Sequence, residues 1–194
     1  MLRTALLTLL TLLIAIGGGA ASVWYALETS GGLGALTVGG WTAYPQAGTA
    51  AADPYSKARV AREAELPLGR AEGLAFSTGR DSANAPLDRN CTYRVEGQIP
   101  PARFWTLYAA GPDNAALPPV GTRARAITAE GVVRQPDNAV IVTVGPNPAP
   151  MNWLAVSGSG PLQLVLTLYD TPVASNESIA DIELPQVLRI ACDD

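Results

Sequence analysis

The feature that most constrains this chain is an uncharged run near its N-terminus. From Thr4 to Leu27 the sequence TALLTLLTLLIAIGGGAASVWYAL holds 24 residues without a charged side chain. A helix rises 1.5 Å per residue, so this run spans about 36 Å and is long enough to cross a hydrocarbon core of about 30 Å. Such a helix satisfies its own backbone hydrogen bonds in lipid. Residues 1–27 are therefore predicted to form a transmembrane anchor.

The residues that flank this run predict its direction in the membrane. Arg3 precedes it and Glu28 follows it, while Trp24 and Tyr25 suit the membrane–water interface. Because positive charge is retained on the cytoplasmic side, the N-terminus is expected in the cytoplasm. Residues 28–194 are then expected in the periplasm or outside the cell.

Two other interpretations of the same segment stay open. In the first it is a cleaved signal peptide, with a basic start, an apolar core at 5–16 and small residues GAAS as the cleavage site. The apolar stretch continues past that site through VWYAL, which favours an anchor. In the second it is a buried helix of a soluble domain. The small residues Gly17 and Ala21 have the spacing that lets two helices approach, a hint of a homo-oligomer.

Several classes of function are disfavoured by the composition. The chain has no histidine and two cysteines, so it lacks the usual general base of hydrolytic triads and the commonest metal ligand. We predict no metal site and no cofactor. Its formal net charge is −4 and its charges are interspersed, so nucleic acid is not an expected partner. Catalysis by carboxylate, tyrosine or lysine side chains remains possible in principle.

After the anchor, we expect a linker at 28–39 and a folded domain at 40–194. One segment in that domain, 36–45 (LTVGGWTAYP), is read as a single short extended stretch that begins within the linker. A helix is predicted next, because Asp53 can cap it, Pro54 suits its first turn and Pro67 ends it. Its apolar stripe is narrow, so the helix is expected to pack on a larger body through this stripe: Tyr55, Ala58, Ala61 and Ala64.

The larger body is predicted to be β-structure. In CTYRVEG, Cys91, Tyr93 and Val95 share one face of a strand, and LQLVLTLY alternates in the same way. Prolines separate these runs, which is typical of short strands joined by turns. The expected fold is a mainly β, antiparallel sandwich of jelly-roll type with one flanking helix. Its predicted strands are 73–78, 91–97, 103–109, 123–129, 138–145, 162–169 and 186–191.

Three stretches together resemble a known family. They are DPYSKARVAREAELPLGRAEGLAF, LDRNCTYRVEGQIPPARFWTLYA and NWLAVSGSGPLQLVLTLYDTP, in that order. The chain resembles the domain of unknown function 1214 family over roughly residues 40–192. The resemblance implies a β-sandwich with a flanking helix, here without the second domain found in some members and with a membrane segment instead. It implies no agreed activity.

The two cysteines are predicted to form a disulfide. Cys91 begins a predicted strand and Cys192 follows the last one, and an exported domain lies in an oxidising compartment. A bond between them is expected to tie the final strand to the sheet. Two buried free thiols are the alternative.

Two short motifs offer candidate binding residues. Arg70 and Glu72, in LGRAEG, are able to flank a ligand or act as cation and acid in a cleft, or else to stabilise a turn. Asn152 and Trp153, in MNWL, are able to stack on a sugar or aromatic ligand, or else to close the end of the core. We predict no catalytic residue.

The sequence thus predicts a membrane-anchored, exported β-sandwich that serves as a binding or envelope-associated module. The alternative is an exported hydrolase or carbohydrate-active enzyme that uses two carboxylates. That alternative requires a concave pocket lined by at least two Asp or Glu residues.

Overall fold

A computed structural model describes residues 2–28, 34–63, 67–69, 71–112, 114–175 and 182–192. Arg70 and Ala64 therefore lie outside the described residues.

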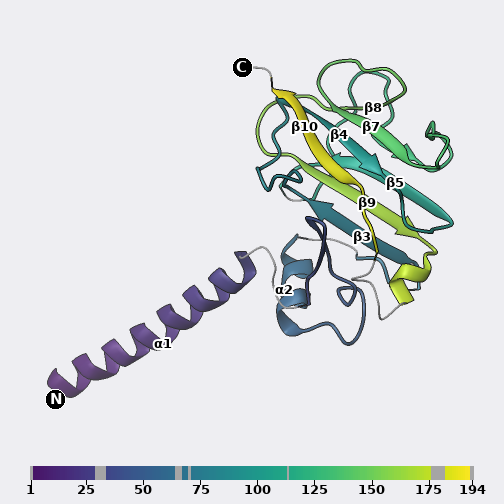
Figure 1. The fold of residues 1–194 in the computed structure, drawn as a ribbon. Coiled ribbons are helices and arrows are strands. Elements are labelled where there is room, and N and C mark those ends of the chain that lie inside the picture. The colour runs from purple at the N-terminus through teal and green to yellow at the C-terminus, as the bar shows by residue number, and fades with distance from the viewer. Residues whose placement is uncertain are drawn as a thin grey trace.

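A long helix, α1 (Leu2–Glu28), extends away from a β-rich body (Figure 1). Its Leu2–Tyr25 stretch has a mean hydropathy of 2.1 and none of it is buried against the rest of the chain. Leucine and isoleucine side chains are exposed along the helix. Because no protein surface covers them, this apolar helix matches either a membrane anchor or a signal sequence. A helix buried in a soluble domain is excluded by this exposure.

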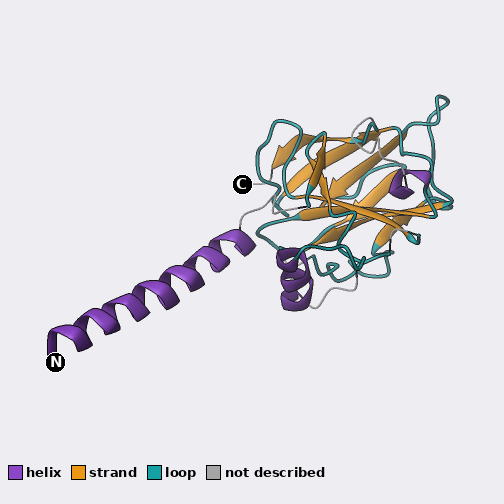
Figure 2. Ribbon diagram, turned by 90° about the horizontal axis from the view of Figure 1, so that it is seen from below, coloured by secondary structure: helices purple, strands orange, loops and turns teal. Residues whose placement is uncertain are grey.

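The body is built from two sheets that face each other (Figures 1 and 2). The larger sheet has six strands in the order β1-β2-β3-β9-β5-β6, and the smaller has four in the order β10-β4-β7-β8. This two-sheet sandwich confirms the predicted mainly β fold, while jelly-roll connectivity stays a prediction. The strands of the larger sheet are β1 (Leu36–Val38), β2 (Trp41–Ala43), β3 (Gly73–Thr78), β9 (Gln163–Tyr169), β5 (Phe104–Ala110) and β6 (Ala126–Thr128). Those of the smaller sheet are β10 (Gln186–Cys192), β4 (Cys91–Gly97), β7 (Val140–Gly145) and β8 (Asn152–Ala155).

One strand pair departs from the expected antiparallel pattern. β8 runs parallel to β7, with Val142 opposite Asn152 and Val144 opposite Leu154. No strand is predicted between 138–145 and 162–169, but residues 146–151 form a turn that leads into one. They carry the chain back to the start of β7, so that a four-residue strand lies alongside it in the same direction.

The segment 36–45 is a hairpin, and the prediction of a single extended stretch was wrong. Leu36 pairs with Ala43 and Val38 with Trp41. Gly39 and Gly40 have φ values of 55° and 91°, the positive range that a tight two-residue hairpin turn requires. The two glycines therefore reverse the chain where a longer strand was expected.

The core lies between the sheets and follows the alternation seen in the sequence. Leu164, Leu166 and Leu168 of β9 are at most 1% exposed. From the opposite sheet, Tyr93 of β4 and Val142 of β7 face them in the same hydrophobic cluster. Burial of these side chains supplies most of the driving force for the fold, at about 1.5–3 kcal/mol for each large apolar side chain.

The predicted helix is present as α2 (Pro54–Glu63), and Asp53 caps it by accepting a hydrogen bond from the Ser56 backbone N–H at 3.0 Å. Its packing face was predicted wrongly. Ala58 and Ala61 are exposed, whereas Ser56 is buried and Val60 is half-buried. Ala58 and Ala61 therefore face outward, and the side with Ser56 and Val60 faces the body. The remaining helical segment is a short 3-10 turn, η1 (Pro172–Ser175).

Candidate functional site

A polar groove lies at one end of the smaller sheet. Its volume is about 650 Å³. Three carboxylates line it, from Glu96 at the end of β4, Asp137 in the turn before β7, and Glu183 in the segment before β10. The remaining lining residues are Gly97, Gln98, Gln135, Pro136, Ala139, Ile141, Leu184 and Gln186. The described lining thus combines carboxylates, glutamine amides and a few apolar side chains, without lysine or arginine.

The floor of the groove is set by strand register. Gln186, Glu96 and Ile141 lie side by side on neighbouring strands β10, β4 and β7. Their sequence neighbours Val187, Val95 and Val142 are buried in the core. Because successive strand residues point to opposite sides, the three floor residues face outward. The alternation of CTYRVEG, which put Glu96 on the polar face, is confirmed.

The wall of the groove is an ordered turn. The Gln135 N–H donates to the Ala139 carbonyl at 2.8 Å, and Asn138 adopts a positive φ of 68° that closes the turn. The Asp137 carboxylate accepts a hydrogen bond from the Ala139 N–H at 3.1 Å, while its backbone carbonyl accepts from the Gln98 side chain at 2.9 Å. These contacts fix Asp137 against the floor.

Glu96 also has a charged neighbour on its own strand. The Arg94 Nε lies 2.7 Å from Glu96 Oε2, and both side chains are partly exposed. Two residues along a strand share a face, so Arg94 occupies the next row of the outward surface. This row continues through Thr143 of β7 to Trp153 of β8, which are opposite each other in register. The groove and Trp153 therefore belong to one continuous sheet face.

Asn152 has a structural role in the sandwich. Its side-chain oxygen accepts a hydrogen bond from the Val133 N–H at 2.7 Å. Its Nδ2 group donates to the carbonyls of Val133 and Ile141 at 2.7 and 2.8 Å. With this side chain buried, Asn152 joins the loop before β7 to the edge of β8, and three of its hydrogen-bonding positions are used inside the protein.

Trp153 lies half-buried on the outward face. Its indole N–H donates to the Gly145 carbonyl at 3.0 Å, and the Arg123 guanidinium lies 4.7 Å from its ring centroid. The ring is thus covered by a cation on one side. A ligand that stacks on that side of the ring has to displace Arg123.

Glu72 stabilises the turn that leads into β3. Its carboxylate accepts a hydrogen bond from the Gly69 N–H at 3.1 Å, and its carbonyl accepts from the Asp170 N–H at 2.9 Å. Glu72 precedes a strand of the larger sheet, whereas Asn152 and Trp153 belong to the smaller one. The groove lining includes none of these three residues. Their predicted role in binding stays a prediction.

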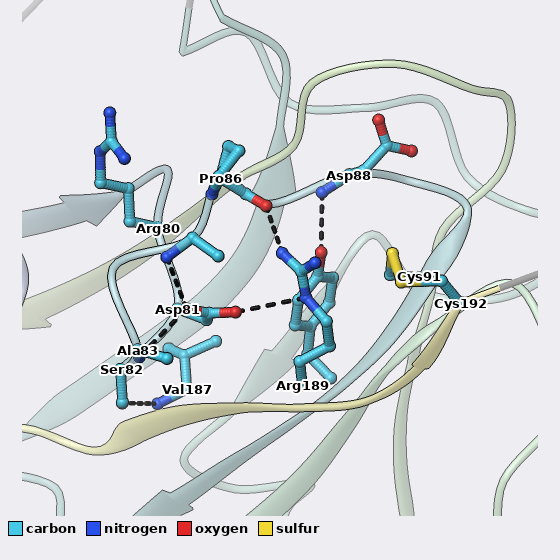
Figure 3. Close-up of polar contacts among 12 residues, drawn as sticks. Arg80, Asp81, Ser82, Ala83, Pro86, Asp88, Cys91, Val187, Arg189 and Cys192 are labelled. Atoms are coloured by element: carbon cyan, nitrogen blue, oxygen red, sulfur yellow. Dashed lines mark hydrogen bonds and ion pairs between the residues drawn. A yellow bond between two sulfur atoms is a disulfide. The ribbon is translucent and has the colours of Figure 1, made fainter.

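A second polar network joins the loop between β3 and β4 to β10 (Figure 3). Asp81, whose side chain is 4% exposed, pairs with the Arg189 Nε at 3.2 Å and accepts hydrogen bonds from the N–H groups of Ala83 and Ala85. Arg189 also donates to the Pro86 carbonyl and stacks over the Tyr93 ring. Both oxygens of the Asp81 carboxylate have protein partners, which indicates a structural role.

Two further contacts complete this junction. Ser82 and Val187 exchange hydrogen bonds, from the Ser82 N–H to the Val187 carbonyl at 2.8 Å and from the Val187 N–H to the Ser82 hydroxyl at 3.0 Å. The Cys91–Cys192 disulfide is present at the far end of β10, which confirms the predicted bond (Figure 3). A disulfide of this kind indicates an oxidising compartment.

Sequence reasoning missed the groove carboxylates, and within the described residues no group of three His, Cys, Asp or Glu side chains is arranged to hold a metal ion. Glu96, Asp137 and Glu183 are far apart along the chain. Glu96 is the penultimate residue of a predicted strand, and Asp137 and Glu183 come shortly before two others. The available signal was their position at strand ends. Only the strand order β10-β4-β7 brings these ends together.

One solved structure shares this fold at low sequence identity, and a second has a lower similarity. The VPA0106 protein from Vibrio parahaemolyticus is 16% identical, with a TM-score of 0.57 over 71% of this chain and 36% of that one. An uncharacterised protein from Burkholderia cenocepacia is 15% identical, with a TM-score of 0.40 over 93% of this chain and 52% of that one. The chain thus spans about a third and about half of these proteins. No curated protein matches.

The sequence itself places the chain in a family. The match begins at Glu72 and ends at Val173, so it contains β3 to β9 of the sandwich and is narrower than the expected span of 40–192. It covers more than half of the chain. The chain belongs to the family described as protein of unknown function (DUF1214), whose model matches residues 72–173.

Proposed function

We propose that this protein is a membrane-anchored β-sandwich that binds a carbohydrate in the groove lined by Glu96, Asp137 and Glu183. The groove, with its mixture of carboxylates, amides and one outward isoleucine, is the observation that carries the proposal.

The chemistry of the lining favours a ligand rich in hydroxyl groups. Carboxylates accept hydrogen bonds and glutamine amides both donate and accept them, so together they suit the hydroxyls of a sugar. Ile141 on the floor offers an apolar surface for the C–H face of a pyranose ring. Since the described lining contains no lysine or arginine, an anionic ligand finds no partner charge there.

The proposed side of the membrane for the sandwich rests on the charged residues that flank the apolar stretch of α1. Arg3 before the apolar stretch and Glu28 after it favour a cytoplasmic N-terminus with the sandwich on the periplasmic or extracellular side. The Cys91–Cys192 bond supports this placement, because disulfides persist in oxidising compartments. A binding domain held there by an anchor meets the polysaccharides of the cell envelope.

Binding is tested with the full chain in detergent and a panel of soluble oligosaccharides: gluco-oligomers and N-acetylglucosamine oligomers, titrated by calorimetry. Glu96→Gln and Asp137→Asn each remove a groove charge with little change of shape, and about a tenfold loss of affinity is expected for each. Glu130→Gln is the matched control, because Glu130 is exposed and does not line the groove. The proposal is wrong if the native chain and the three variants bind with equal affinity, or if no oligomer binds.

A carbohydrate-active enzyme is the second candidate, and one observation favours it. Three separate segments bring carboxylates to a single groove, and glycoside hydrolysis uses a pair of them. Measuring the release of reducing ends from the bound oligosaccharide distinguishes an enzyme from a binding module. An enzyme loses turnover in Asp137→Asn or Glu183→Gln while it retains substrate binding, whereas a binding module releases no sugar in any variant.

A further inference from the structure

The outward face of β7 connects the groove to Trp153. Its outward residues are Ile141, Thr143 and Gly145, because the two valines between them belong to the core. Ile141 lines the groove, and Thr143 lies opposite Trp153 on the neighbouring strand β8. The floor of the groove therefore continues along β7 to the position of the indole ring.

This part of β7 presents small side chains to solvent. Thr143 is half-buried and short, and Gly145 has no side chain. Arg94 lies beside Thr143 on β4, but its Nε is paired with Glu96 Oε2 at 2.7 Å, so the guanidinium is directed along its own strand. A chain-like ligand that leaves the groove is thus able to lie along β7.

The ring of Trp153 is fixed to the sheet and covered by a replaceable cation. Its indole N–H donates to the Gly145 carbonyl at 3.0 Å, which holds the edge of the ring against β7. The Arg123 guanidinium lies 4.7 Å from the ring centroid, and Arg123 is exposed. A cation–π contact at an exposed site is weak, so a ligand displaces it at small cost. A fixed aromatic ring of this kind suits the C–H face of a sugar.

The distance between these two positions sets the length and shape of a ligand that reaches both. Ile141 and Gly145 are four residues apart on one strand, which is about 13 Å, or roughly the length of three linked pyranose rings. The path along a strand is straight, so the ligand has to be extended. Cello- and chito-oligosaccharides, the β-linked oligomers of glucose and N-acetylglucosamine, are extended, whereas α-linked malto-oligosaccharides coil.

We infer that Trp153 is a second sugar-binding position of the same site, and that the ligand is an extended β-linked oligosaccharide that runs from the groove along β7 to this ring. One sugar lies in the groove on Ile141, and a later sugar of the same chain stacks on Trp153 after it displaces Arg123. The inference rests on the carbohydrate binding proposed for the groove, and it adds the length and the shape of the ligand.

The dependence of affinity on chain length tests this inference. The full chain in detergent is titrated by calorimetry with the disaccharide and the pentasaccharide of the cello, chito and malto series. The measured quantity is the ratio of pentasaccharide to disaccharide affinity within one protein, so a general loss of binding cancels. Trp153→Ala removes the ring and Arg123→Ala uncovers it. Phe104→Ala is the matched control, because it removes a half-buried aromatic ring from the larger sheet.

A longer β-linked ligand is expected to bind more tightly to the native chain. In the series that binds, the ratio is expected to be about tenfold, without such a gain in the malto series. Trp153→Ala is expected to reduce the ratio to about two, whereas Phe104→Ala leaves it at the native value. Arg123→Ala is expected to raise the affinity for the pentasaccharide about two- to fivefold, because no cation has to be displaced.

Four results contradict the inference. A native ratio near one, or a native ratio that is unchanged in Trp153→Ala, overturns the second position while disaccharide binding still supports the groove. An equal gain in the malto series overturns the extended shape of the ligand. A lower pentasaccharide affinity in Arg123→Ala means that the guanidinium rather than the ring meets the sugar. If no oligosaccharide binds at all, the proposed function itself fails, and the inference fails with it.

Discussion

Cys91 and Cys192 lie directly opposite each other at the end of the β4–β10 pair, although 101 residues separate them along the chain. Their bond closes almost the whole sandwich into one loop. It also joins the edge strand β10 to its neighbour at the end where the chain finishes. The last strand, β10, is thus covalently linked to β4, which comes first in the sequence among the strands of the smaller sheet.

Loss of this bond is expected to destabilise the sandwich. In the chain-entropy model a loop of about 100 residues contributes about 4–5 kcal/mol, and measured values are about 2–5 kcal/mol. Replacing both cysteines by alanine is expected to lower the free energy of unfolding by that measured amount. Urea denaturation followed by circular dichroism measures it. The native chain should show no free thiol before reduction and two after it, and one or more thiols beforehand contradicts the bond.

The Asp81–Arg189 pair offers a second test. Asp81→Ala removes the acceptor of two backbone N–H groups and of the arginine, so it is expected to cost about 2–4 kcal/mol. Arg189→Met keeps the two backbone hydrogen bonds of Asp81. Because about a third of the Arg189 side chain is exposed to solvent, the loss of its ion pair is expected to cost about 1–2 kcal/mol. Urea denaturation measures the loss of stability in both variants, and the loss in Asp81→Ala should be the larger.

A matched control exists on the surface. Arg103 and Asp170 lie 3.6 Å apart, but both side chains are largely exposed. Solvent screens such pairs, so Arg103→Met is expected to leave the midpoint of unfolding unchanged. Equal losses at Arg103 and Arg189 contradict a structural role for the buried network.

Asn152 is predicted to be sensitive even to an isosteric change. Asn152→Asp keeps the acceptor for the Val133 N–H, but it turns a second acceptor toward the carbonyls of Val133 and Ile141. Loss of two donated bonds with that repulsion is expected to cost about 3 kcal/mol or more. Thermal unfolding measures the change. An Asn152→Asp variant as stable as the native chain argues that the side chain does not hold the loop to β8.

Gly73 is expected to tolerate no side chain. A Cβ atom built there lies 2.1 Å from the Leu168 carbonyl oxygen, which belongs to the paired strand β9. Gly73→Ala therefore has to separate β3 from β9, and a loss of about 1–3 kcal/mol is expected. Gly121→Ala is a useful comparison, because that glycine has open space around it although its φ is positive. Urea denaturation should show the larger loss at Gly73.

Much of the fold could be predicted because its strands have clear alternation. Six of the seven predicted strands exist with shifts of at most two residues at their ends, whereas the strand predicted at 123–129 is shortened to 126–128. The apolar face of LQLVLTLY is the centre of the core. The hairpin at 36–45 and the strand at 152–155 were missed. They contain three or four residues each, which is too few for a period to be recognised, and their pairing depends on turns and on a parallel neighbour.

The candidate site was less predictable for a related reason. LGRAEG and MNWL were predicted as binding motifs because each places polar, charged or aromatic residues close together in the sequence. Glu96, Asp137 and Glu183 are brought together only by strand order, and no local pattern encodes that order. The outward face of α2 shows the same limit. Periodicity identified a stripe of alanines, but Ala58 and Ala61 are exposed while Ser56 is buried, and no local pattern encodes which side of the helix meets the body.

The reciprocal hydrogen bonds between Ser82 and Val187 have a consequence for contacts between copies of this chain. Unsatisfied backbone groups along an edge strand attract strands from other molecules. Ser82 occupies both the N–H and the carbonyl of Val187 on the free edge of β10, so that this position of the edge is closed to a strand from a neighbouring copy.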